Sequence, residues 1–219
     1  MIRKMTSVCA LGAIAFAALV TVSIEAQVGK PVTGIMDANT APEAALLKMP
    51  HMTPAIVKGL IDKRNFNSIV ELNAYLLSAG LTQPQAMEFY GTGAFIHVNL
   101  ETGTREEILL IPNAGTRMAR EFAEYRPWTS WAQFDKEIGK YVNNDQVVVD
   151  KLKQYVFIPV NLNTAVDADI LSIPGAGSRM VREFKEYRPW TTKTQFDKEI
   201  SKYVGQKETD RLWRYVVIK

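Results

Sequence analysis

Two stretches of this chain, 62 positions apart, have nearly the same sequence. Residues 111–142 and residues 173–204 are identical at 24 of 32 positions. Self-similarity at a fixed period indicates tandem copies of one structural unit. An eroded third copy lies 124 positions before the last one, because Met49-Pro50 aligns with Ile173-Pro174. The chain is therefore predicted to fold as three similar units.

The first 26 residues have the pattern of a secretory signal peptide. Arg3 and Lys4 precede an apolar run from Val8 to Val22, and Ile24-Glu25-Ala26 is an acceptable cleavage site. The run has 15 residues, fewer than the roughly 20 that a membrane-spanning helix needs. We therefore expect residues 1–26 to be removed, leaving a periplasmic or extracellular protein with no integral membrane span. An uncleaved membrane anchor is the alternative.

Cysteine content and charge limit what the mature chain can do. Cys9 is the only cysteine and lies in the predicted leader, so neither a disulfide nor a thiolate metal site is expected. Residues 27–98 carry 5 basic and 5 acidic side chains, residues 99–160 carry 8 and 9, and residues 161–219 carry 11 and 8. A polyanionic partner should therefore prefer the last unit.

Each unit reads as four short helices with little or no sheet, so the predicted fold class is all-α. The period of the repeat places the units at residues 27–98, 99–160 and 161–219. A β-branched stretch such as Val156–Val160 ends a unit and is expected to be a short extended connector.

Capping patterns mark the expected helix starts. Thr164, with Asp167 three residues later, is a candidate N-cap for the first helix of the last unit, and Thr40 with Glu43 repeats the pattern in the first unit. The third helix of every unit is predicted to begin at a capping box, which pairs Ser68 with Glu71, Ser130 with Gln133, and Thr192 with Gln195.

A glycine-rich turn separates the first two helices of the last unit. The first helix should end at Ile173-Pro174, because the residue before a proline is pushed out of the helical region. Glycine lets the turn through Gly175-Ala176-Gly177 adopt positive φ. Successive N–H groups in such a turn form an anion-binding concavity, and the next helix adds the positive end of its dipole. A phosphate oxygen would fit there.

These residues carry a resemblance to a known family. The last unit resembles the helix-hairpin-helix family, in particular secreted ComEA-like competence DNA receptor domains. The resemblance lies in Asn161-Leu162-Asn163-Thr164-Ala165, the turn just described, Tyr187-Arg188 and Tyr215-Val216-Val217. The resemblance covers the last unit and most of the middle one. It implies a hairpin that offers backbone N–H groups to a DNA phosphate, with a basic residue two positions after the second glycine. The implied phosphate-binding residues are Gly175, Ala176, Gly177, Ser178, Arg179 and Arg182.

The other two units depart from this motif. In the middle unit Asn113 replaces the first glycine, and asparagine adopts left-handed geometry less freely. The first unit has His51-Met52-Thr53-Pro54 with no glycine and is predicted to be structural only. A second, weaker phosphate site is implied in the middle unit at Ala114, Gly115, Thr116, Arg117 and Arg120.

A plainer interpretation of the hairpin remains open. The turn can be a tight connection only, with Arg179 and Glu183 as an i,i+4 pair that solvates the surface, like Arg182 and Glu186. Trp128 and Trp190 each precede a capping box and are expected in the core. Stacking on nucleic acid bases is the alternative for both rings.

No catalytic site, cofactor or metal site is predicted. His51 and His97 have no cysteine or carboxylate cluster at ligand spacing and are expected to be ordinary surface or boundary residues. The repeated carboxylates, such as Asp197 and Glu199, alternate with lysines and are expected to face solvent.

The sequence thus predicts an exported, non-enzymatic protein that binds DNA by its phosphates without sequence specificity. Capture or uptake of DNA is the role that the resemblance suggests. The alternative is an envelope scaffold that binds a protein partner and no nucleic acid. Binding to mixed-sequence DNA that weakens with salt would favour the first interpretation.

Overall fold

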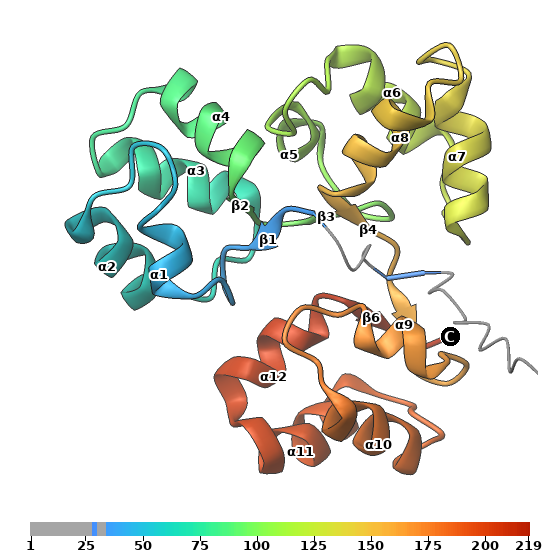
Figure 1. Ribbon diagram of the computed structural model, residues 1–219. Coiled ribbons are helices and arrows are strands. Elements are labelled where there is room, and N and C mark those ends of the chain that lie inside the picture. The colour runs from blue at the N-terminus through green and yellow to red at the C-terminus, as the bar shows by residue number, and fades with distance from the viewer. Residues whose placement is uncertain (1–27, 30–33) are drawn as a thin grey trace, which may run out of the picture.

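The computed structural model in Figure 1 describes residues 28–29 and 34–219. The predicted signal peptide at residues 1–26 lies outside the described residues. The described part of the chain forms twelve helices and six two-residue strands, which confirms a predominantly helical fold with only small strands. Figure 1 shows the helices in three groups, arranged around a common centre where short strands lie.

All three units have the same order of elements, a short strand at each end and four helices between them. The first unit comprises β1 (Met36–Asp37), α1 (Glu43–Leu46), α2 (Pro54–Lys63), α3 (Ile69–Ser78), α4 (Gln83–Thr92) and β2 (Ala94–Phe95). The second comprises β3 (Val98–Asn99), α5 (Arg105–Leu109), α6 (Thr116–Glu124), α7 (Trp131–Gly139), α8 (Gln146–Lys153) and β4 (Val156–Phe157). The third comprises β5 (Val160–Asn161), α9 (Asp167–Leu171), α10 (Ser178–Glu186), α11 (Lys193–Val204), α12 (Gln206–Trp213) and β6 (Val216–Val217).

The opening and closing strands of each unit pair with one another in parallel. Val98 lies opposite Val156, and Val160 lies opposite Val216; β1 and β2 pair in the same way. Parallel strands need a long crossover between them, and here the four helices of the unit form it. The extended connectors expected from the sequence are therefore strands that close each unit.

The loop after each opening strand is fixed by two repeated contacts. The side-chain oxygen of Asn161 accepts the amide of Asn163, as Asn99 and Asp37 do at the equivalent positions. The Arg188 guanidinium then donates to the carbonyl oxygens of Leu162 and Ala165, each at 2.7 Å. Arg64 and Arg126 make the equivalent pairs of bonds in the other units.

This loop shifts the start of the first helix in two units. The prediction of Thr164 and Thr40 as N-caps is wrong, because α9 and α1 begin after Val166 and Pro42. The amides of Thr164 and Ala165 already bond to the carbonyl oxygen of Asn161 as part of the turn. The predicted starts of the third helices are confirmed, since Ser68, Ser130 and Thr192 each accept the amide three residues later.

The two tryptophans before these helices lie in the core, as predicted. Trp128 is 2% exposed and Trp190 is 1% exposed. Their indole nitrogens donate to the carbonyl oxygens of Phe122 and Phe184, at 2.8 and 2.7 Å. A buried indole with a satisfied N–H holds the second and third helices at a fixed angle, so neither ring is available for base stacking.

In the second and third units a tyrosine before the closing strand joins the unit to the preceding one. Tyr155 packs edge-on against Phe95 with ring centroids 5.1 Å apart, and Tyr215 packs on Phe157 at 4.6 Å. The third unit also contacts the first, because the side-chain amide of Asn65 donates to the carbonyl oxygen of Lys207 at 2.6 Å. The three units therefore form a closed ring.

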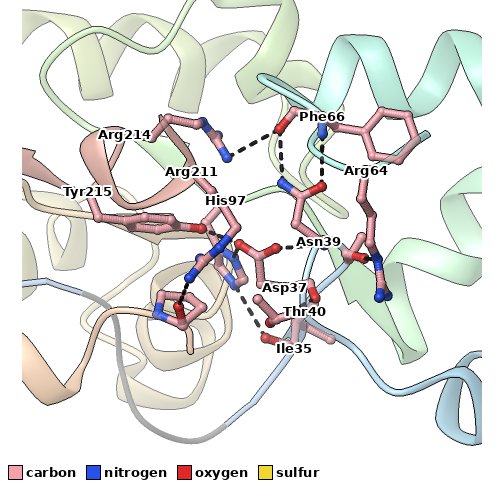
Figure 2. Close-up of polar contacts among 12 residues, drawn as sticks. Ile35, Asp37, Asn39, Thr40, Arg64, Phe66, His97, Arg211, Arg214 and Tyr215 are labelled. Atoms are coloured by element: carbon pink, nitrogen blue, oxygen red, sulfur yellow. Dashed lines mark hydrogen bonds and ion pairs between the residues drawn. The ribbon is translucent and has the colours of Figure 1, made fainter. Parts of the chain in front are cut away.

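Figure 2 shows the polar cluster at the centre of this ring. The Tyr215 hydroxyl donates to the buried carboxylate of Asp37, and His97 Nδ1 lies 3.6 Å from the same carboxylate. His97 is 1% exposed, and its Nε2 lies 3.2 Å from the carbonyl oxygen of Ile35. His97 is therefore not an ordinary surface residue: it is buried where all three units meet.

Candidate nucleic-acid interface

The hairpin between the first two helices has the same backbone shape in all three units. Gly175 has φ of 78°, and the equivalent Asn113 and His51 have φ of 66° and 64°. All three therefore adopt the left-handed conformation that only glycine adopts without strain. The first two units have another residue in place of this glycine, but the backbone conformation of the turn is the same.

The alanine amide of each predicted phosphate site is already bonded within its own turn. The amide of Ala176 donates to the carbonyl oxygen of Ile173 at 2.9 Å, and that of Ala114 donates to Ile111 at 3.0 Å. Both alanine amides are therefore unavailable to a ligand. Among the predicted phosphate-binding residues, these two contribute only to the shape of the turn.

The next three amides have no acceptor within the described residues. In the third unit they belong to Gly177, Ser178 and Arg179, which are all exposed. Gly177 is the N-cap of α10 and has no side chain to accept an amide. A side chain at Gly177 would meet open space. The start of α10 is thus uncapped, solvent-accessible and positively polarised.

The middle unit has the same arrangement. Gly115 is the N-cap of α6, provides no side-chain cap and is surrounded by open space. The amides of Gly115, Thr116 and Arg117 likewise have no acceptor in the described part of the chain, and all three residues are exposed.

In the first unit the equivalent helix start is blocked. Thr53 occupies the N-cap position of α2, and its hydroxyl oxygen accepts the amide of Ile56 at 3.3 Å. Pro54 follows and has no N–H to offer. A ligand would find fewer free donors here, in keeping with the prediction that this unit is structural only.

The predicted arginines divide into two kinds. Arg182 donates to the carboxylate of Glu183 with Nη2 to Oε1 at 2.7 Å, and Arg120 makes the same bond to Glu121 at 2.6 Å. Glu183 is 2% exposed. Burial raises the pKa of this carboxyl group, but the bond from Arg182 and the nearby Tyr203 hydroxyl outweigh burial, so its pKa is lowered.

These bonds differ from both interpretations of the hairpin. Under the plainer interpretation Arg182 would pair with Glu186 and Arg179 with Glu183, whereas Arg182 bonds to Glu183. Because Arg182 and Arg120 are neutralised by buried carboxylates, each can offer a phosphate little net charge.

Arg179 and Arg117 are the free cations beside the exposed amides. The Arg179 guanidinium lies over the ring of Tyr203, 4.9 Å from its centroid, and Arg117 lies 4.7 Å from that of Tyr141. Both arginines are exposed, and neither forms an ion pair with any described residue. Each hairpin therefore presents amides and one unpaired arginine together.

The tyrosines were not among the predicted site residues. Tyr203 lies at the end of α11 and Tyr141 lies just after α7, and both are half-buried. The signal that could have revealed them is the repeat itself, because the first unit has Ala79 at this position and Ala55 in place of the arginine.

The described residues contain no cluster of three or more histidine, cysteine or acidic side chains that could hold a metal ion. Within the same residues, no helix is long and apolar enough to cross a membrane. No family model matches the chain, and comparison with curated proteins and with solved structures gives no match either.

Proposed function

We propose that this protein is an exported, non-enzymatic DNA-binding protein that holds backbone phosphates at the hairpins of its second and third units. One observation carries the proposal. Two of the three units leave the start of α6 or α10 uncapped, exposed and next to an unpaired arginine, while the first unit blocks the same position with Thr53 and Pro54. Capture or retention of DNA outside the cytoplasm is the proposed role.

The chemistry of this site fits a phosphate and no particular base. Converging amides at a helix N-terminus bind an anion, and Arg179 or Arg117 adds a full positive charge. Contacts of this kind fix the backbone of the nucleic acid and carry no sequence information. Two such arginines predict a shallow salt dependence, with a slope of log K against log salt of about −2.

A substitution at the two N-cap glycines separates binding from stability. Gly177 and Gly115 have extended backbones, with φ of −110° and −87° and ψ near 180°, so any residue fits. Aspartate there would cap the helix and add a few tenths of a kcal/mol of stability. Its carboxylate would also occupy the phosphate position. The variant Gly115→Asp/Gly177→Asp should lose at least tenfold in affinity for a mixed-sequence duplex while its melting temperature stays equal or rises.

The matched control is Gly115→Ala/Gly177→Ala. Alanine is a poorer N-cap than glycine and should lower the melting temperature, but it leaves the amides exposed and should still bind DNA. Filter binding at two salt concentrations, with circular dichroism melts, measures both properties. Retention of DNA by the aspartate variant at the parent affinity would rule out the hairpins as the site.

The alternative function is an interaction module, and one observation favours it. Leu47, Leu109 and Leu171 occupy the same position in the three units, and their exposed fractions are 40, 37 and 48%. A repeated exposed leucine can contact a protein partner. Under this alternative the purified protein would not bind DNA at low salt. Substitution of the three leucines by serine would remove binding to an envelope partner.

A further inference from the structure

A pair of hydrogen-bonded tyrosines recurs beside each hairpin arginine. The hydroxyl groups of Tyr187 and Tyr203 lie 2.8 Å apart, and those of Tyr125 and Tyr141 lie 2.8 Å apart as well. In the second and third units the pair joins the end of the second helix to the end of the third. All four tyrosines are half-buried.

Cations lie over the rings of this pair. Arg179 lies over Tyr203, and Lys202 lies 5.7 Å from the centroid of the Tyr187 ring. The middle unit repeats both contacts, with Arg117 over Tyr141 and Lys140 at 5.5 Å from Tyr125. A cation over an aromatic face is attracted by the ring quadrupole, which restricts a side chain that would otherwise move freely.

Carboxylates pair with the other cations beside these tyrosines. In the third unit Lys202 bonds to Glu199, and Arg182 bonds to Glu183. Arg179 lies over the ring of Tyr203 and forms no ion pair with any residue that the structure describes. Its charge therefore sits next to the exposed amides of Ser178 and Arg179.

The cluster and the open hairpin are lost together. In the first unit the positions of Arg179, Tyr187 and Tyr203 are occupied by Ala55, Lys63 and Ala79. The first unit is also the one whose helix start is capped by its own threonine. Both features are lost in the same unit, and that unit keeps the fold. The tyrosine pair is therefore associated with the phosphate site and is not required for the fold.

We infer that Tyr203 and Tyr187, with Tyr141 and Tyr125 in the second unit, are positioning residues that hold the hairpin arginine against a ring and aim it at the bound phosphate. The inference rests on the proposed DNA-binding function. A long arginine side chain loses rotamer freedom when it binds, and an arginine already held on a ring loses less. Tyr203 thus acts through Arg179 and need not touch the nucleic acid.

The test compares two substitutions of the same tyrosines. Tyr141→Leu/Tyr203→Leu removes the rings and should weaken duplex binding about tenfold, the fold-change that corresponds to two exposed cation–π contacts. Tyr141→Phe/Tyr203→Phe keeps the rings and should recover most of the affinity. Trp131→Leu is the matched control, since it removes a half-buried ring that the third unit lacks, where Lys193 stands instead, and it should bind like the parent.

A readout without DNA separates failure of this inference from failure of the proposed function. Relaxation of the Arg179 Nε–H group by NMR should show a lower order parameter in the leucine variant than in the parent. If the parent does not bind DNA, the proposed function fails and this measurement still tests the holding of Arg179. Equal order of Arg179 in both proteins, or parent-like DNA affinity of a folded leucine variant, would overturn the inference.

Discussion

At the scale of single residues, the repeated Tyr-Arg motif has a structural role. Arg188 sends both arms of its guanidinium to carbonyl oxygens of the loop after β5, and Arg126 and Arg64 do the same in the other units. The motif contributed to the family resemblance. Its arginine already donates hydrogen bonds within the fold and is not available to bind a phosphate.

Arg188→Lys tests this role. Lysine cannot reach both carbonyl groups in the fixed geometry of a guanidinium, so the loop loses a charged hydrogen bond. We expect the free energy of unfolding to fall by about 1–3 kcal/mol, measured by urea denaturation. DNA affinity of the folded variant should stay at the parent value. A variant as stable as the parent would show that the two bonds contribute nothing.

Residue patterns predicted the hairpin, the caps of the third helices and the buried tryptophans, because each depends on a few neighbours in sequence. They did not predict the bond from Arg182 to Glu183. The rule for helix surfaces favours partners three or four apart, and it presumes that both side chains are exposed. Glu183 is buried, so its partner is the cation that can reach inward.

At the scale of elements, the helices follow from the sequence and the strands do not. Amphipathic spacing and capping boxes predict four helices in each unit. A strand of two residues has no alternating pattern to detect, and its parallel partner lies about sixty residues away in the chain. The stretch at residues 28–29 is a similar case, because its only structural feature is contact with distant segments.

This stretch, Val28-Gly29, joins the second and third units. Gly29 exchanges backbone hydrogen bonds with Ile158, and Val28 packs against the hydrophobic cores on both sides. Gly29 has φ of 86°, and a Cβ there would lie 1.8 Å from the Ser172 hydroxyl oxygen. The short segment is therefore built around a glycine.

Gly29→Ala should destabilise the protein by about 1–3 kcal/mol, through overpacking and a strained φ. Gly91→Ala is the matched control, since Gly91 lies in α4 with open space around its Cα. The control should be neutral or stabilising by up to roughly 1 kcal/mol. Thermal melts of both variants measure the difference. Equal melting temperatures would show that residues 28–29 do not hold the units together.

At the scale of the whole molecule, the closed ring of three units contains a buried charge, the Asp37 carboxylate, which no sequence pattern predicted. Asp37 belongs to the first unit, Tyr215 belongs to the third, and His97 lies between the first and second. Burial raises the pKa of the Asp37 carboxyl group, but its contacts with His97, Tyr215 and Arg214 outweigh burial and hold the pKa well below its usual range. No local pattern reports contacts between residues that are 178 positions apart.

The sign of this pKa shift gives a pH dependence. Because the folded pKa of Asp37 is depressed, its stabilisation is fully present above the unfolded pKa of about 3.9 and is lost as pH falls below that value. Asp37→Asn should cost about 3 kcal/mol at pH 7, since it removes the buried carboxylate that accepts from Tyr215 and faces His97 and Arg214. Urea denaturation at pH 7, 5 and 3 should show this difference shrinking only at pH 3. A difference that is the same at all three pH values would contradict the assignment.

The proposed function depends most directly on which residues of the protein contact DNA. In an NMR titration of the purified protein with a short mixed-sequence duplex, the amide signals of Gly177, Ser178 and Arg179, and of Gly115 to Arg117, should shift and should return as salt is added. The amides at the start of α2, behind Thr53, should not move. Shifts confined to other surfaces, or no shifts at low salt, would contradict the proposal that these two hairpins bind phosphate.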